Sequence, residues 1–190
     1  MATIEALWAA WEGPGLEHLR LRVDGDGARA DSVIIALDDA GRPFRARFAI
    51  ETDAGWRVRR ARIELLGDPA PALDLRADGL GHWTDAVTGA ARPLDGCLDI
   101  DVYPSPFTNT LPNRRLPAPA VGTPVALAVA YVALPELTVQ PAPQEYTLLE
   151  RRADGARWRF RSLDSDFTAE LPVDGAGLVR DYPGIARRLR

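Results

Sequence analysis

The stretch that decides the fold class is FRARFAIE, residues 44–51. Apolar side chains occupy every even position from 44 to 50, whereas arginine or glutamate occupies positions 45, 47 and 51. Successive side chains of a β-strand point to opposite faces of its sheet, so a period of two indicates a strand with one buried face. This segment therefore predicts a strand that lies on a core.

The same alternation recurs along the chain, at residues 19–23 and 157–161, and residues 125–132 are apolar on both faces, which is typical of a central strand. Turn signals built on aspartate and glycine separate these runs, at residues 24–27, 39–41, 53–55, 154–155 and 174–175. Short strands at regular spacing indicate a barrel, sandwich or roll. We predict an all-β, antiparallel β-roll or half-open barrel of about twelve strands with little helix.

One segment near the N-terminus fits two structures. Residues 4–11 place apolar side chains at Ile4, Leu7, Trp8 and Trp11, the spacing of an amphipathic helix, but the segment is also compatible with a strand. The sequence Gly13-Pro14-Gly15 ends either element.

The chain also contains an internal repeat. WRVR at 56–59 matches WRFR at 158–161, and L-x-x-D-G-x-G at 75–81 matches the same pattern at 171–177. The order of the matching segments is the same in both halves, so we expect residues 1–190 to form a single domain with similar halves at 16–85 and 96–182. Trp56 and Trp158 should then occupy equivalent positions, as should the two Asp-Gly turns.

The second half carries an insertion, PSPFTNTLPNRRLP at residues 104–117. Four prolines restrict its backbone, and long segments of this kind inside compact domains are usually functional or disordered. We expect this one to be ordered and to pack on the strand that carries Asp99 and Asp101, with one of Arg114 and Arg115 paired to an aspartate and the other available.

The composition excludes several classes of function. A net charge of −4 argues against a nucleic-acid partner, and no segment reaches the 18 consecutive apolar residues that a membrane-spanning helix needs. All 23 basic residues are arginine, so a Schiff-base lysine and pyridoxal phosphate are excluded. One cysteine, two distant histidines and four scattered serines supply neither a metal site nor a nucleophile motif. We expect no cofactor and a cytoplasmic location.

Two carboxylates stand out as candidates for chemistry. Asp99 and Asp101 lie two residues apart on a predicted strand, so they share a face at the spacing that paired acid and base roles allow. The alternative is an ion pair with Arg114 or Arg115, which follow on the adjacent loop.

Four motifs together resemble the bacterial family named Putative glycolipid-binding: LDGCLDID at 94–101, PFTNTLPNRRL at 106–116, QEYT at 144–147 and DGAGLVRDYP at 174–183. The resemblance extends from about residue 8 to residue 188. It implies a β-roll similar in shape to bacterial lipoprotein carriers, with a cavity for acyl chains. Asn113 departs from the family pattern, which leads us to expect an apolar residue there.

The main hypothesis is therefore a binding protein without enzymatic activity that holds a glycolipid or another amphipathic molecule in a cleft between the β halves. Carboxylates and amides would bind hydroxyl groups, an aromatic ring would stack beneath them, and arginine would bind an anionic head group. The candidate ligand-binding residues are Trp83, Asp99, Asp101, Phe107, Thr108, Asn109, Arg114, Arg115, Gln144 and Tyr146. The alternatives are a sugar-directed hydrolase or isomerase that uses Asp99 and Asp101, and a dimerisation or partner-binding module that uses an open sheet edge.

Overall fold

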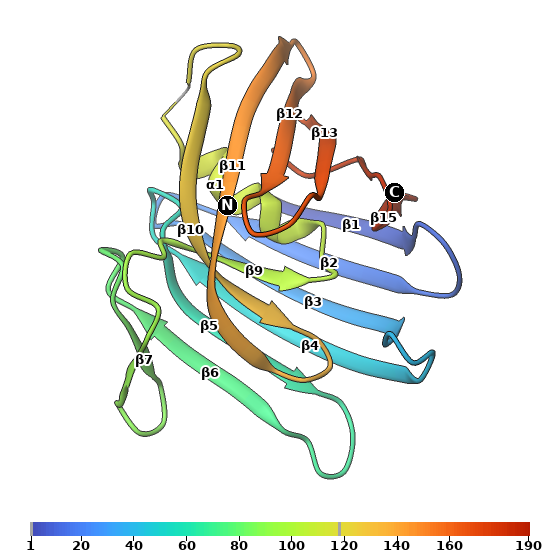
Figure 1. Ribbon diagram of the computed structural model, residues 1–190, viewed down its shortest axis with the longest axis vertical. Helices are drawn as coiled ribbons and strands as arrows, with labels where there is room; N and C mark the ends of the chain where they lie inside the picture. Colours follow the sequence, from blue (N-terminus) through green and yellow to red (C-terminus); the bar gives the residue numbers. More distant parts are fainter. Residues whose placement is uncertain (1, 118) are drawn as a thin grey trace.

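The computed structural model describes residues 2–117 and 119–190. Its fifteen strands form two curled sheets that together make a half-barrel (Figure 1). The predicted all-β class with little helix is confirmed, although the strands number fifteen instead of about twelve. Within the described residues, no helix has the length and apolar character that crossing a bilayer requires.

The larger sheet has ten strands in the order β14-β15-β1-β2-β3-β4-β5-β6-β7-β8, and every neighbouring pair is antiparallel. Its strands are β1 (Ala2–Ala10), β2 (Leu16–Val23), β3 (Ala28–Leu37), β4 (Pro43–Thr52), β5 (Val58–Leu65), β6 (Ala72–Ala77), β7 (Trp83–Asp85), β8 (Ala91–Arg92), β14 (Asp181–Tyr182) and β15 (Ala186–Arg188).

The smaller sheet has five strands in the order β13-β12-β11-β10-β9. They are β9 (Asp99–Tyr103), β10 (Pro124–Ala133), β11 (Thr138–Arg152), β12 (Gly155–Ser162) and β13 (Thr168–Asp174). Strands β9 and β10 pair in parallel, which corrects the expectation of purely antiparallel halves. A parallel pair needs a crossover that returns the chain to its starting end, so the insertion after β9 has a topological cause.

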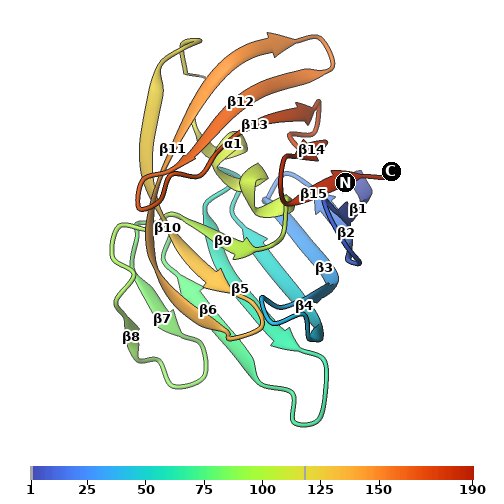
Figure 2. The ribbon, with the colours of Figure 1, turned by 45° about the vertical axis from the view of Figure 1, so that its right-hand side comes forward.

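The crossover contains two short helices, which the sequence analysis did not predict. They are the 3₁₀ helix η1 (Phe107–Asn109) and helix α1 (Thr110–Arg115), and they lie between the two sheets in both views of the ribbon (Figures 1 and 2). Pro112 falls in the first turn of α1, where a missing backbone N–H is tolerated. Phe107 is fully buried and stacks on Phe48 of the larger sheet, with 6.0 Å between ring centroids.

The ambiguous N-terminal segment is the strand β1. Ala6 and Trp8 point into the core, and the Trp8 indole N–H donates to the Val179 carbonyl oxygen at 2.8 Å. Strand β1 pairs with β2 on one side and with the C-terminal strand β15 on the other. The last strands of the chain therefore complete the sheet that the first strands begin.

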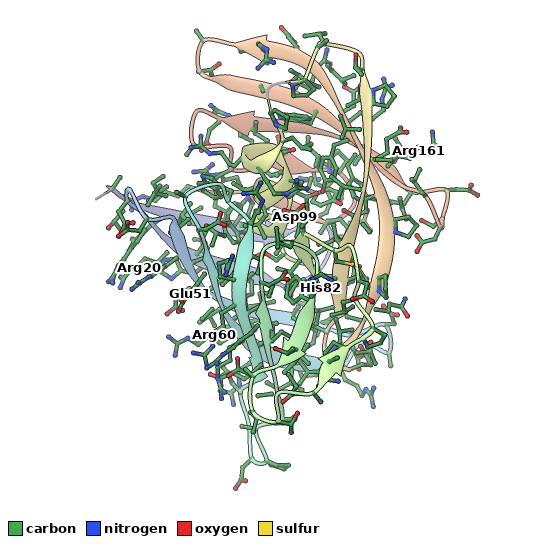
Figure 3. The ribbon with its side chains drawn as sticks, turned by 90° about the vertical axis from the view of Figure 1, so that its left-hand side faces the viewer. Arg20, Glu51, Arg60, His82, Asp99 and Arg161 are labelled. Atoms are coloured by element: carbon green, nitrogen blue, oxygen red, sulfur yellow. The ribbon has the colours of Figure 1, made fainter. Side chains whose placement is uncertain are left out.

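The outer face of the larger sheet is charged. Figure 3 shows Arg20, Glu51 and Arg60 along this outer side, and Asp99 in the middle of the molecule. Arg20 is half-exposed and pairs with Glu5, and Arg60 pairs with Asp74 on the neighbouring strand. The charged positions of residues 44–51 therefore lie on the outer face of the sheet, and the apolar positions face the core.

A recurrent turn connects several strands. In the turns that begin at Asp38, Asp53, Asp78 and Asp174, the aspartate Oδ1 accepts hydrogen bonds from the backbone N–H groups two and four residues later. The fourth residue of each turn has positive φ. It is glycine in three of the turns, at 41, 81 and 177, but Trp56 in the fourth, with φ of 62°. This left-handed backbone conformation costs a residue with a Cβ about 1–2 kcal/mol.

These turns bear on the proposed repeat. Because four turns share the geometry, the match between residues 75–81 and 171–177 does not by itself indicate duplication. Trp56 precedes the first paired residue of β5, whereas Trp158 lies inside β12 and pairs with Leu148 and Leu171. The expectation that the two tryptophans are equivalent is wrong, and the duplication of 16–85 and 96–182 stays a prediction.

A buried glutamate joins the larger sheet to the crossover. Glu17 of β2 accepts hydrogen bonds at 2.7 Å from the hydroxyl groups of Ser32 and Ser105, and both contacts use Oε1. Among the described residues, Oε2 has no partner. Burial raises the pKa of Glu17 to about 7, although both serine hydroxyls oppose the rise.

Candidate functional site

A pocket of about 490 Å³ opens on the face of the smaller sheet that carries Asp101, Gln144 and Phe160. Strands β9 to β12 form its floor, and the β12–β13 turn and the segment around β14 form its wall. The lining residues are Asp101, Tyr103, Tyr131, Gln140, Ala142, Gln144, Phe160, Ser162, Asp164, Ser165, Phe167, Tyr182 and Ile185. Two of the predicted site residues, Asp101 and Gln144, are among them.

The floor of the pocket is a hydrogen-bonded polar cluster. Asp101 Oδ2 accepts from the Gln144 side-chain N–H at 2.7 Å, and Oδ1 accepts from the Thr108 hydroxyl at 2.9 Å. Behind them, the Tyr146 hydroxyl donates to Asn109 Oδ1 at 2.9 Å. Five predicted site residues therefore meet here, and Thr108 and Asn109 tie the crossover to the sheet.

Burial shifts the pKa values of the ionisable groups on this floor. Burial raises the pKa of Asp101, and the hydrogen bonds from Gln144 and Thr108 oppose the rise. Burial first, and then the Asp101 charge, raises the pKa of Tyr131 to about 12. Tyr131 therefore keeps its proton at neutral pH and presents a neutral hydroxyl group to the pocket.

The wall of the pocket is aromatic. Phe160, Phe167 and Tyr182 form a triangle: the ring centroid of Phe160 lies 6.0 Å from that of Phe167 and 6.2 Å from that of Tyr182, and those two are 6.1 Å apart. Tyr146 meets the edge of Phe160 at 5.4 Å. The pocket therefore combines a continuous apolar wall with a polar floor.

Asp99 does not line the pocket. Its carboxylate is fully buried and accepts from Arg115 Nη2 at 2.6 Å and from Arg115 Nε at 3.0 Å. Burial raises the pKa of Asp99, and the Arg115 hydrogen bonds and charge oppose the rise. The hydrolase hypothesis required Asp99 and Asp101 to face one cleft, so the arrangement does not support it. The predicted ion pair between this strand and one arginine is confirmed.

Arg114, the other arginine, leaves α1 in a different direction and lies in a separate groove next to Trp56. Phe107 and Trp83 lie outside the pocket. Phe107 packs against the larger sheet, and Trp83 is buried there with its indole N–H donating to the Cys97 carbonyl oxygen at 2.7 Å. The expectation that Trp83 stacks beneath a ligand therefore has no support from its position.

Helices η1 and α1 contact β9, as expected for the insertion. Sequence reasoning missed the aromatic wall of Phe160, Phe167 and Tyr182. Asp101 was predicted from its shared strand face with Asp99, and Gln144 and Tyr146 from the motif at 144–147, whereas aromatic residues at alternating positions are typical of an ordinary core.

Comparisons with known proteins identify the family of this chain. The profile of the family described as Putative glycolipid-binding matches residues 5–188. The chain belongs to this family. Among solved structures, this family member is similar to a DUF1089 family protein from Pseudomonas aeruginosa, with 39% sequence identity and a TM-score of 0.80 over 94% of this chain and 95% of the other. A search of curated proteins found no match.

Proposed function

We propose that this family member binds an amphipathic molecule of the glycolipid type, with the head group in the Asp101 pocket, and does not transform it. The observation that carries the proposal is the combination of a hydrogen-bonding floor with an aromatic wall in one open pocket. Concave sites with a few convergent polar groups and apolar walls are the usual form of small-molecule sites. The family name points in the same direction.

The floor suits a ligand rich in hydroxyl groups. A carboxylate has about four lone-pair sites, and Gln144 and Thr108 use two of those on Asp101. The remaining sites can accept from ligand hydroxyl groups, and the phenol of Tyr131 can both donate and accept. A carboxylate and neutral phenols favour a sugar over a phosphate at this position, because an anionic ligand would be repelled by Asp101.

The size of the pocket limits what it can hold. Its volume of about 490 Å³ lies within the range of roughly 300–1,000 Å³ that drug-sized ligands occupy. A sugar head group with the first part of a chain fits this range, so we propose that longer acyl chains extend past Phe167 at the rim. A cytoplasmic location is also part of the proposal.

Alkyl glycosides test the proposal directly. Isothermal titration of the wild type with octyl glucoside, below its micelle concentration, should show saturable binding. Asp101→Asn should weaken that binding about tenfold, since a hydrogen bond to a charged group contributes roughly 1.5–3 kcal/mol. Asp31→Asn changes an exposed aspartate on the outer face of the larger sheet and serves as the matched control.

Octanol, which has the same chain but neither a sugar nor a charge, distinguishes head-group binding from chain binding. If octanol binds as tightly as octyl glucoside, and Asp101→Asn weakens neither, the pocket does not bind a sugar through Asp101. If neither ligand binds and native mass spectrometry finds no small molecule on protein purified from its own host, the proposal fails.

A further inference from the structure

A second groove, of about 300 Å³, opens on the same face of the smaller sheet as the Asp101 pocket. Leu148 and Trp158 in its wall lie two residues along β11 and β12 from Tyr146 and Phe160, so they share the face of the first pocket. Asn113 and Arg114 of α1 form its other wall, and no residue lines both hollows. The ligand binding proposed for the Asp101 pocket does not involve this groove.

Arg114 brings an available charge to the groove. Within residues 2–117 and 119–190, no carboxylate lies within ion-pair distance of its guanidinium group. The guanidinium carbon lies over the Trp56 ring, 4.9 Å from its centre, which is a cation–π contact. The N–H groups at the edge of the guanidinium plane stay available for a planar, bidentate partner such as a phosphate or a carboxylate.

Two of the recurrent turns position Arg114. The Asp53 turn has Trp56 at the position where the other three turns have glycine, and that residue supplies the ring on which Arg114 lies. The Asp174 turn has Gly177 at the same position, and a Cβ there would come within 2.9 Å of the Arg114 Cδ atom. Residues held in unfavourable backbone conformations cluster at ligand sites, and Trp56 fits that pattern.

Asn113 gives a second, independent indication of a ligand. Its side-chain N and O atoms are both buried, and within the described residues neither has a hydrogen-bond partner. Buried polar groups are satisfied in most proteins, so each such exception needs an explanation. An acceptor in the groove would satisfy the Asn113 N–H group.

The other charged residues leave the groove positive. Arg151 donates to the Pro119 carbonyl oxygen, and Arg152 pairs with Glu150. Asp174 is the one carboxylate of the lining, and it already accepts from two backbone N–H groups and from Arg188. The charge of Arg114 is therefore uncompensated inside the groove.

We propose that this groove binds an anionic group, a phosphate or a carboxylate, through the guanidinium edge of Arg114 and the amide of Asn113. The anion is either a free small molecule or the head group of a lipid, and the two sources share the same chemistry. The site goes beyond the proposed glycolipid pocket, because it uses different residues and the opposite charge.

Inorganic phosphate is the first probe. NMR titration of the intact protein should show saturable shifts of the Gly175, Gly177 and Arg114 amides. Arg114→Gln should weaken binding at least tenfold, and Arg114→Lys should give an intermediate loss because lysine lacks the bidentate geometry. Arg20→Gln removes an equally accessible arginine from the outer face of the larger sheet and should leave the affinity unchanged.

Vesicles provide the second arm, since a lipid head group could replace free phosphate. Co-sedimentation with phosphatidylglycerol vesicles, but not with phosphatidylcholine vesicles, should depend on Arg114 if the anion is part of a lipid. The proposal is overturned if neither probe binds, or if Arg114→Gln and Arg20→Gln bind alike. Octyl glucoside binding by Arg114→Gln should equal that of the wild type, which separates this test from that of the Asp101 pocket.

Discussion

Glu17 illustrates at the scale of one residue how burial sets the behaviour of a charge. Both of its hydrogen bonds come from neutral hydroxyl groups to one oxygen, and the other oxygen is buried without a partner among the described residues. Neutral donors stabilise a carboxylate less than a cation does, so the environment favours the protonated form. That preference becomes a measurable dependence of stability on pH.

The predicted dependence follows from the direction of the shift. The pKa of Glu17 rises from 4.5 to about 7 on folding, so between these values the folded protein binds more protons than the unfolded chain. The free energy of unfolding should therefore fall as the pH rises from about 4.5 to 7, by about 3 kcal/mol at most. Glu17→Gln should lose this dependence and exceed the wild type in stability above pH 7.

Urea denaturation at several pH values gives the free energy of unfolding of the wild type and of Glu17→Gln as a function of pH. The difference between these two curves isolates Glu17, because Asp99 and Asp101 contribute equally to both. Glu12→Gln changes an exposed glutamate and should leave the curve of the wild type unaltered. Parallel curves for the wild type and Glu17→Gln would contradict the prediction.

The neighbouring arginines of α1 should differ in their effect on stability. Arg115→Ala leaves the fully buried Asp99 carboxylate without its counter-charge and should cost about 3–5 kcal/mol. Arg114→Ala removes one cation–π contact at an exposed position and should cost about 1 kcal/mol or less. Thermal and urea unfolding compare the two variants, and equal losses would show that the ion pair is not what stabilises this region.

At the scale of the element, the crossover between β9 and β10 connects the two sheets. Phe107 packs on Phe48 of the larger sheet, while Thr108 and Asn109 bind the polar floor on the smaller sheet. Two helices of three and six residues have little stability of their own, so this packing must hold them in place.

Phe107→Ala should therefore cost about 3–5 kcal/mol, the usual loss for removing a fully buried aromatic ring. Binding of octyl glucoside should weaken as well, since Thr108 follows Phe107 directly. Leu80→Ala, at a residue that is 78% exposed, is the control and should change the stability by less than about 0.5 kcal/mol. Hydrogen exchange would locate the loss, which we expect in η1 and α1 before the sheets.

The elements also show what a sequence can and cannot predict. Alternation such as that of residues 44–51 identifies a strand and its buried face, because the period of two is a property of the single strand. Alternation within one strand does not indicate whether the neighbouring strand runs parallel or antiparallel to it. The parallel pairing of β9 and β10 was therefore not predicted. Strands β7, β8, β14 and β15 have only two or three residues, too few to show alternation.

The candidate site was predictable to a similar extent. Asp101 was predicted because it shares a strand face with Asp99, Gln144 because it belongs to a motif of the family resemblance, and Arg115 because it follows an aspartate-bearing strand. Phe160 and Tyr182 were not, because whether an aromatic side chain meets a packed core or an open pocket depends on the segment that covers it. That segment belongs to the other sheet, and local pattern does not predict this long-range packing.

At the scale of the whole molecule, the sheet edges bear on assembly. The edges of the larger sheet are β8 and β14, two residues each, and those of the smaller sheet are β9 and β13, with five and seven residues. Short edge strands discourage edge-to-edge association. In addition, an isolated antiparallel β-bridge joins Val179 to Val173 of β13, so part of this edge strand is already paired.

We therefore expect light scattering to give the mass of a monomer, 20.7 kDa. This outcome would reject the alternative in which an open edge forms a homodimer. A mass twice as large would favour that alternative, and lysine or proline substitutions along β13 would then identify the edge involved.

The pairing of β1 with β15 has a consequence for biosynthesis. Trp8 pairs with Arg188, and its indole N–H donates to the Val179 carbonyl oxygen, so β1 finds its outer neighbour only about 170 residues later in the chain. During synthesis, β1 must therefore lie beside β2 with one edge unpaired until residues 179–188 have left the ribosome. Stalled chains that end before residue 179 should consequently be captured by chaperones through β1, and chains that extend past residue 188 should no longer be captured. Crosslinking from Trp8 in ribosome-bound chains of increasing length would measure the moment of closure.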